Sequence, residues 1–206
     1  MARTGVKVAI LASGEGTNAE RLIRAAEARE DVDIALVGCN RAEAGVLRRA
    51  EALGATTWVF SRGDLDSGAV LERLRAEGIG FVALVGFLLK VPPGLVRAFE
   101  GRMLNLHPSL LPAFGGKGMY GHHVHKAVHA ALLQGEVDRT GITLHWVTEE
   151  FDEGAPFFQA EVELDAATDT PESIGDKVRQ LEVEHYADQA LRAVVEAVSL
   201  SGTPLD

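Results

Sequence analysis

The feature that most constrains the fold is an alternation of two kinds of segment in the first half of the chain. Residues 7–12 (KVAILA) form a short apolar run with β-branched side chains, and residues 19–28 (AERLIRAAEA) follow with apolar residues at helical spacing. The same pair of segments recurs at residues 33–39 and 44–54, 56–60 and 67–78, and 81–87 and 92–101. Strands that alternate with helices are typical of a doubly wound, mostly parallel sheet flanked by helices, so we expect an α/β fold.

The second half of the chain departs from this pattern. After residues 102–108 (RMLNLHP) come a long loop, a helix near residues 125–135 and two apolar runs joined by a short acidic turn, residues 141–147 (GITLHWV) and 156–164 (PFFQAEVEL). We expect the two runs to form an antiparallel strand pair.

The last periodic segment, residues 170–198, predicts one long final helix, in which Thr170 can cap the N-terminus and Pro171 suits the first turn. No stretch rich in Pro, Ser or charge divides the chain, so we expect a single domain over residues 1–206. Within it, residues from about 5 to 100 would bind a phosphate or nucleotide, and residues from about 101 to 200 would carry the chemistry.

Composition narrows the classes of partner. The hydrophobic share of 47% and the charged share of 24% are those of an ordinary globular chain. With 20 basic and 30 acidic residues the net charge is −10, which disfavours nucleic acid and anionic membranes, so any phosphate has to be held locally. The lone Cys39 allows no internal disulfide, and the first ten residues have neither the apolar length of a signal peptide nor that of a membrane span. We therefore expect a cytoplasmic protein.

A candidate phosphate site lies in residues 13–18 (SGEGTN), between the first strand and its helix. Gly14 and Gly16 permit close backbone approach, and the amides at a helix start attract anions. The motif is neither a P-loop, because the Lys-Ser/Thr pair is missing, nor a complete G-x-G-x-x-G fingerprint. An ordinary turn with Thr17 or Asn18 as the helix cap fits equally well. Glu15 is compatible with an anion only if its side chain points away.

A candidate catalytic pair ends the strand in residues 105–112 (NLHPSLLP). Because side chains alternate along a strand, Asn105 and His107 project to one face. Pro108 favours extended geometry at His107 and withholds the next ladder donor, so the pair lies at the carboxyl end of a strand, where α/β sheets bind ligands. An amide donor beside a histidine suits stabilisation of an oxyanion in acyl transfer, although both residues could equally satisfy backbone groups.

A third group should organise the water or the imidazole. Asp152, in the acidic turn EEFDEGAP, is our candidate, because Gly154 and Pro156 make a tight connection that can present its carboxylate. On composition alone Asp64 or Asp66 could take this role.

Taken together, the segments SGEGTN, VGFLLKVP, NLHPSLLP, FDEGAP and TPESI follow the order seen in phosphoribosylglycinamide formyltransferases, of the folate-dependent formyltransferase family. The chain resembles this family to about residue 195. The resemblance implies a Rossmann-like formyltransferase fold and transfer of a formyl group from 10-formyltetrahydrofolate, the co-substrate, to the amino group of glycinamide ribonucleotide in purine synthesis. It implies direct attack by the amine and no metal.

The resemblance also implies roles for individual residues. Asn105, His107 and Asp152 match the catalytic trio of the family. The positions that match its substrate-binding residues are Gly16, Thr17, Asn18, Arg179 and Glu182, and those that match its folate-binding segment are Leu88, Leu89, Lys90 and Val91. Lys90 stands one position away from the arginine of many members and would face the glutamate tail of the folate. Residues 113–122, longer than the corresponding loop in many members, predict a mobile lid.

The remaining histidines and the two tryptophans are not expected to be catalytic. His122, His123, His125 and His129 could form a metal cluster, but no paired cysteines or third-ligand motif accompany them, and His123 and His125 match a helix-start motif of the family near the formyl site. A lone strand histidine, His145, is typical of a hydrogen-bonded structural group. Trp58 and Trp146 are expected to pack in the core.

Two other functions compete. One is a related formyl-folate enzyme: a hydrolase, a sugar-amine formyltransferase or an initiator-tRNA formyltransferase. The tRNA enzymes and hydrolases usually carry an additional domain, for which 206 residues leave no room, and the net charge of −10 disfavours tRNA. The other is a catalytically silent phosphate-binding module. We expect small-molecule substrates, no nucleic-acid or membrane partner, and a monomer or homodimer.

Overall fold

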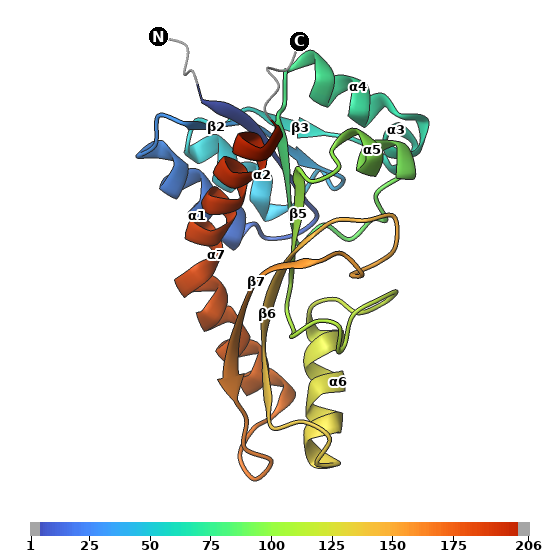
Figure 1. The fold of residues 1–206 in the computed structure, drawn as a ribbon, viewed down its shortest axis with the longest axis vertical. Coiled ribbons are helices and arrows are strands. Elements are labelled where there is room, and N and C mark those ends of the chain that lie inside the picture. Colours follow the sequence, from blue (N-terminus) through green and yellow to red (C-terminus); the bar gives the residue numbers. More distant parts are fainter. Residues whose placement is uncertain (1–4, 202–206) are drawn as a thin grey trace.

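The computed structural model describes residues 5–201 of the chain. Its centre is a seven-stranded sheet in the order β3-β2-β1-β4-β5-β6-β7 (Figure 1). The strands are β1 (Val6–Ala12), β2 (Val32–Cys39), β3 (Thr57–Val59), β4 (Phe81–Val85), β5 (Met103–His107), β6 (Arg139–Trp146) and β7 (Pro156–Glu163). Strands β1 to β5 are parallel, whereas β6 pairs antiparallel with β5 and β7 antiparallel with β6. The mostly parallel sheet with a C-terminal antiparallel pair is confirmed.

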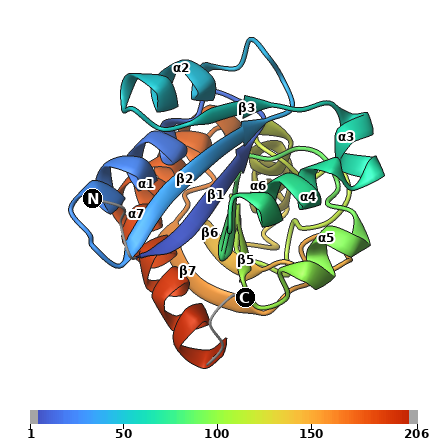
Figure 2. The ribbon, with the colours of Figure 1, turned by 90° about the horizontal axis from the view of Figure 1, so that it is seen from above.

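Helices cover both faces of this sheet, as Figure 2 shows with α1 and α7 on one side and α4 and α5 on the other. The helices are α1 (Thr17–Glu27), α2 (Gly45–Ala52), α3 (Arg62–Ser67), α4 (Ala69–Ala76), α5 (Pro93–Ala98), α6 (His122–Leu133) and α7 (Pro171–Ser201). In the part of the chain that the structure describes, no helix combines the length and the apolar character that a membrane crossing requires.

The core is divided by the sheet into two layers because side chains alternate along each strand. On β1, Val8 and Ile10 face the cluster built with α1, α2, α6 and α7, while Ala9 and Leu11 face the cluster built with α3, α4 and α5. Every residue of β4 is buried. A strand buried on both faces reads as a continuous apolar run, which is why the parallel half was visible in the sequence.

The helix predicted over residues 67–78 is α4 in the structure, and a short helix that was not predicted, α3, precedes it. Ser61 accepts a hydrogen bond from the Asp64 amide and Asp64 accepts one from the Ser61 amide, and this reciprocal capping box starts α3. Gly68, with φ of 89°, ends α3 and precedes α4. At the final helix, the Thr170 hydroxyl accepts from the Ser173 amide, which confirms Thr170 as a cap.

Two connections lie on the same side of β5 in Figure 1. One is the loop between β5 and α6, and the other is the turn between β6 and β7. They contact each other where the Gly116 amide donates to the Asp152 carboxylate. This junction places the candidate catalytic residues.

Candidate active site

The three expected catalytic residues converge at the carboxyl end of β5. Asn105 and His107 project from one face of this strand, and His107 is only 3% exposed. Asp152, in the turn between β6 and β7, brings its Oδ2 to 3.6 Å from His107 Nδ1. The structure thus joins a strand end and a distant turn into one cluster.

Backbone geometry at two points of this cluster is unusual. Among residues 5–201, the non-glycine residues with positive φ are Phe114 and Asp152, both at 57°. Such a conformation is strained for a bulky residue and tends to occur at functional sites. At Phe114 it accompanies a carbonyl oxygen that lies 2.9 Å from His107 Nε2. Since a carbonyl only accepts, the Nε2 atom of His107 carries a hydrogen.

The loop between β5 and α6 therefore contacts two members of the trio. Phe114 holds His107 through its carbonyl, and the Gly116 amide donates to Asp152 Oδ2 at 2.9 Å. A side chain at Gly115 would clash, because its Cβ would lie 2.7 Å from Leu111 Cδ2 and 3.2 Å from Asp152 Cβ. A side chain at position 115 would therefore force Leu111 and Asp152 to shift.

Burial and neighbouring groups set the protonation states of His107 and Asp152. Burial lowers the pKa of His107, because desolvation of the imidazolium outweighs the opposing effects of the Asp152 charge and the Phe114 carbonyl. Burial alone would raise the pKa of Asp152, but contacts that include the hydrogen bond from the Gly116 amide bring that pKa below its ordinary value. Near neutral pH the site holds a carboxylate beside a neutral imidazole. A neutral imidazole with a hydrogen on Nε2 can donate to a developing oxyanion.

The structure adds to this cluster a residue that the sequence interpretation placed outside it. His145 lies directly across from Asn105 in the antiparallel pairing of β5 and β6. Its Nε2 is 3.0 Å from Asn105 Nδ2 and 3.5 Å from Asp152 Oδ1. The only sequence signal for this contact was the register of β5 against β6, which strand patterns do not reveal.

The expected phosphate turn begins α1 without a side-chain cap. Gly16, with φ of 77°, occupies the N-cap position, so the alternative with Thr17 or Asn18 as the cap is not adopted. The first helical hydrogen bond runs from the Glu20 amide to the Gly16 carbonyl. The amides of the first turn, including those of Thr17 and Asn18, therefore have no acceptor within the helix. They form the kind of positive end at which anions bind.

The side chains around this turn point elsewhere. Glu15 lies beside Gly45 on α2, since a Cβ at Gly45 would be 2.6 Å from the Glu15 carboxylate. Its carbonyl accepts a hydrogen bond from Arg49. The objection that a glutamate in this turn would repel an anion is therefore weakened.

Residues far apart in the sequence meet beside the turn. The Asn18 side-chain amide donates to Glu182 Oε2 at 2.8 Å, and Arg21 donates to Asn18 Oδ1 at 3.1 Å. Burial raises the pKa of Glu182, against the opposing contributions of Asn18 and of the charges on Arg179 and Arg21. Arg179 itself pairs with Asp176 at 2.5 Å. The expected substrate-binding residues thus gather at the junction of α1 and α7.

The segment expected to bind folate follows β4. Its Leu88 amide donates to the Ser13 hydroxyl, and its Leu88 side chain is 41% exposed, whereas Val91 is buried. Lys90 lies 3.8 Å from Glu150 and 5.3 Å from the ring centre of Phe151. The segment is thereby tied both to the phosphate turn and to the turn that carries Asp152.

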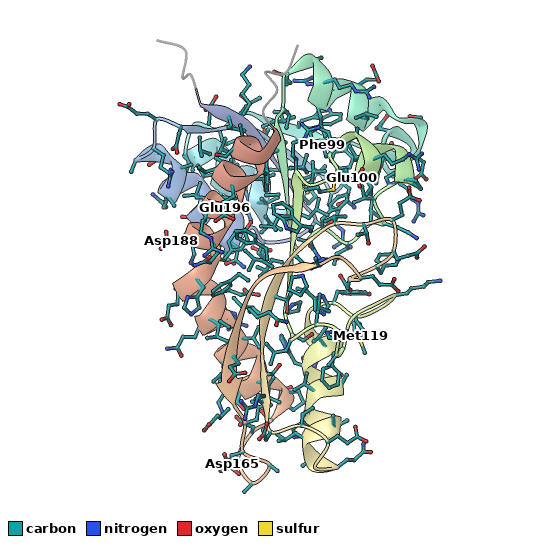
Figure 3. The ribbon with its side chains drawn as sticks, viewed as in Figure 1. Phe99, Glu100, Met119, Asp165, Asp188 and Glu196 are labelled. Atoms are coloured by element: carbon teal, nitrogen blue, oxygen red, sulfur yellow. The ribbon has the colours of Figure 1, made fainter. Side chains whose placement is uncertain are left out.

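A cavity of about 490 Å³ adjoins this turn, and Asp152 lies in its wall. Its other lining residues come from the two connections, namely Leu111, Pro112, Gly115, Gly116, Phe151, Glu153, Gly154, Ala155 and Pro156. Another cavity, of about 590 Å³, lies at the opposite end of β6 and β7 beside Asp165, which Figure 3 labels far from Phe99 and Glu100. Of these two cavities, the first is the one lined by a member of the trio, Asp152.

Several other candidates lie elsewhere. Asp64 caps α3, and Asp66 pairs with Arg62, so neither joins the trio. His123 contacts the ring of Tyr120, and His125 lies against Gly175, with no hydrogen bond or ion pair from either to the trio within residues 5–201. In the same range no group of three histidine, cysteine, aspartate or glutamate side chains is arranged to hold a metal ion.

Sequence comparison assigns a class to this arrangement. The family described as Formyl transferase matches residues 6–190, most of the chain. The match covers the phosphate turn, the strand that ends on His107, the turn with Asp152 and Glu182. The chain therefore belongs to the formyl transferase family.

Particular relatives narrow this class. The chain is 33% identical over 186 residues to the phosphoribosylglycinamide formyltransferase of Bacillus subtilis, covering 87% of this chain and 90% of the relative. It is 36% identical over 189 residues to the chloroplastic phosphoribosylglycinamide formyltransferase of Arabidopsis thaliana, covering 88% of this chain but 63% of that longer protein. The crystal structure of phosphoribosylglycinamide formyltransferase from Anaplasma phagocytophilum matches with a TM-score of 0.79 and 32% identity, over 92% of this chain and 88% of that one. These similarities place the chain in the phosphoribosylglycinamide formyltransferase branch of the family.

Proposed function

We propose that this enzyme transfers the formyl group of 10-formyltetrahydrofolate to the amino group of glycinamide ribonucleotide. The products are formylglycinamide ribonucleotide and tetrahydrofolate, and the step belongs to de novo purine biosynthesis. The observation that carries the proposal is the cluster of Asn105, His107 and Asp152 at the end of β5, in a chain of this family. Both substrates are small molecules, and we propose a monomer or homodimer in the cytoplasm.

The proposed chemistry is direct transfer. The amine nitrogen attacks the formyl carbon, and the carbonyl electrons move onto oxygen to give a tetrahedral oxyanion. Asn105 and His107 donate hydrogen bonds to that oxygen, which supplies the polarisation without a metal. The bond from the formyl carbon to the folate nitrogen then breaks, and a water held by Asp152 carries the proton from the amine to the leaving nitrogen.

In this structure the His107 donor already has an acceptor. The His107 Nε2 hydrogen is directed at the Phe114 carbonyl, 2.9 Å away, and the oxyanion has to replace that acceptor. We propose that residues 113–122 act as a lid that releases His107 when substrate binds. Positive φ at Gly116, Gly118 and Gly121 gives this loop turns that other residues rarely adopt.

We propose that the ribonucleotide lies across the junction of α1 and α7. Its phosphate would meet the first-turn amides at Gly16, Thr17 and Asn18, with Arg179 as a cation nearby. Glu182, held by Asn18 at 2.8 Å, would accept from the ribose hydroxyls. The folate would lie against Leu88, Leu89, Lys90 and Val91, where Lys90 can exchange Glu150 for a carboxylate of the folate tail.

The test is an assay for tetrahydrofolate release with the two substrates added singly and together. Turnover that requires both substrates supports the transferase, and the variant His107→Ala controls for a contaminating enzyme. Turnover with the folate alone indicates a hydrolase. Ribonucleotide binding without turnover, unchanged in His107→Ala, supports the silent binding module and rejects the proposal.

A further inference from the structure

His145 is a buried histidine at the centre of the candidate site that the proposed mechanism leaves without a role. It is 2% exposed and stands opposite Asn105 across β5 and β6. The pairing of β6 with β7 is irregular between Leu144 and His145, so the strand departs from ideal geometry at this side chain. Such irregularities commonly re-aim a side chain beside a functional site.

The contacts of the ring determine where its hydrogen lies. His145 Nδ1 is 3.1 Å from the carbonyl oxygen of Trp146, and a carbonyl cannot donate, so Nδ1 carries a hydrogen. In the neutral ring Nε2 then keeps its lone pair. The polar atoms facing Nε2 are Asn105 Nδ2 at 3.0 Å and Asp152 Oδ1 at 3.5 Å. Of these two, the carboxylate has no hydrogen to give, so Asn105 is the donor.

This bond selects one of the two orientations of the Asn105 amide. Exchange of the amide nitrogen and oxygen by a half-turn would put the oxygen against the Nε2 lone pair, and two acceptors repel. We propose that His145 is a positioning residue, which binds one N–H of Asn105 and thereby keeps the other N–H free for the oxyanion. The proposal deepens the formyl transfer proposed above and rests on it.

The backbone of the turn packs closely against the Trp146 carbonyl, which accepts the hydrogen bond from His145. A Cβ at Gly154 would lie 1.6 Å from the Trp146 oxygen and 3.4 Å from His145 Nδ1. The Trp146 amide in turn donates to the Ala155 carbonyl at 3.0 Å. The turn that carries Asp152 thus fixes the Trp146 carbonyl, and through it the tautomer of His145.

The first experiment reads the tautomer directly and needs no substrate. Nitrogen-15 NMR of histidine-labelled enzyme at pH 7.5, with the His145 signals assigned by comparison with His145→Gln, should show a neutral ring protonated at Nδ1. A ring protonated at Nε2, or at both nitrogens, overturns the proposal, because His145 would then donate and could not hold the amide nitrogen. This result stands whether or not the proposed substrates are correct.

The second experiment is a double-mutant cycle in the transfer assay. His145→Gln should lower kcat about tenfold and leave both KM values within about twofold, since loss of orientation acts on the reacting geometry. Combined with Asn105→Ala it should add nothing, because the residue that it positions is gone. His129→Gln is the matched control, since His129 also hydrogen-bonds a carbonyl, at 3.1 Å, but belongs to the contact with Asp169.

The outcomes separate the two proposals. If the wild type turns over and His145→Gln is fully active, the positioning role is rejected. It is also rejected if the effects of His145→Gln and Asn105→Ala on kcat multiply independently. In both cases the proposed transferase reaction stands. No transfer by the wild type, together with the Nδ1 tautomer, rejects the proposed reaction alone. If His145→Gln fails to fold, the tautomer of the wild-type ring still decides, with signals assigned from Asn105→Ala.

Discussion

The turn between β1 and α1 and the edge formed by β5 and β6 present chemical groups in opposite ways. At the turn, the groups available to a ligand are backbone amides, and the side chains of Glu15 and Asn18 are engaged with other parts of the chain. At the edge, the groups are side chains, and the backbone serves to hold them, as the carbonyls of Phe114 and Trp146 do. At the edge, a substitution should therefore impair the enzyme by removing a side-chain group. At the turn, it should do so by changing the backbone geometry.

Truncation of an edge side chain should have the largest effect on turnover. Asn105→Ala removes one donor to the oxyanion, so kcat should fall by about two to three orders of magnitude while the protein stays folded. Steady-state kinetics with both substrates, beside thermal unfolding of the same preparation, measures this. A variant that keeps near-normal kcat would show that the amide takes no part in the chemistry.

The same division explains how far the sequence could be interpreted. The parallel half could be predicted from local patterns. A strand buried on both faces is a continuous apolar run, and the amphipathic helix after it has apolar residues at helical spacing. Asn105 and His107 share a face for the same local reason. The contact of Asn105 with His145 depends on strand register, and the contact of Asn18 with Glu182 spans 164 positions, so neither is visible in a single segment.

The boundary of α3 shows a local signal that was missed. Ser61 and Asp64 stand three residues apart, as a capping box requires, but no apolar run follows them, and Gly68 interrupts the helical pattern. Asp152 shows a different limit. The acidic composition of its turn does not distinguish Asp152 from its neighbours Glu150 and Glu153. Only the tertiary fold brings the Asp152 carboxylate to His107.

At the turn, a change of backbone geometry should have the next largest effect. Gly16→Ala places a Cβ 2.5 Å from the Val46 Cβ, at a φ of 77° that alanine rarely adopts. We expect a loss of about 1–3 kcal/mol in the free energy of unfolding, together with a raised KM for the ribonucleotide. Urea denaturation and initial-rate kinetics report the two effects.

Gly14→Ala is the matched control for the clash, because its Cβ would meet nothing within 4 Å. Its free energy of unfolding should stay close to that of the wild type. Equal destabilisation by both substitutions would mean that the turn tolerates no added methyl group at all, and would remove the special role of Gly16.

The edge should also be the more sensitive of the two regions to mild acid, through His107. Burial lowers the pKa of this histidine below its ordinary value of 6.5 in the folded state, so the unfolded chain binds the proton more readily. The stability that the neutral ring contributes is therefore complete above pH 6.5 and is lost as pH falls from there toward the lowered pKa of the folded state.

Urea denaturation of the wild type and of His107→Gln between pH 5 and 8 tests this sign. The free energy of unfolding of the wild type should fall relative to that of the variant on the acid side, because glutamine does not titrate. The pKa of Asp152 is lowered in the folded state, so the titration of this carboxylate falls on the acid side of this range. A difference between the two proteins that stays constant with pH would contradict the assigned burial effect.

The smallest effect should come from a substitution at the turn that leaves its backbone alone. Thr17 begins α1, and its side chain is exposed. The cap position is occupied by Gly16, so no side chain caps the helix. If the turn offers only its amides, Thr17→Ala should change the free energy of unfolding by less than about 0.5 kcal/mol and the KM for the ribonucleotide by less than about twofold. A large rise in that KM without loss of stability would show that the hydroxyl contacts the phosphate. The turn would then bind its ligand through a side chain, as the edge does. Gly16 would remain the one position of the turn at which backbone geometry decides the effect of a substitution.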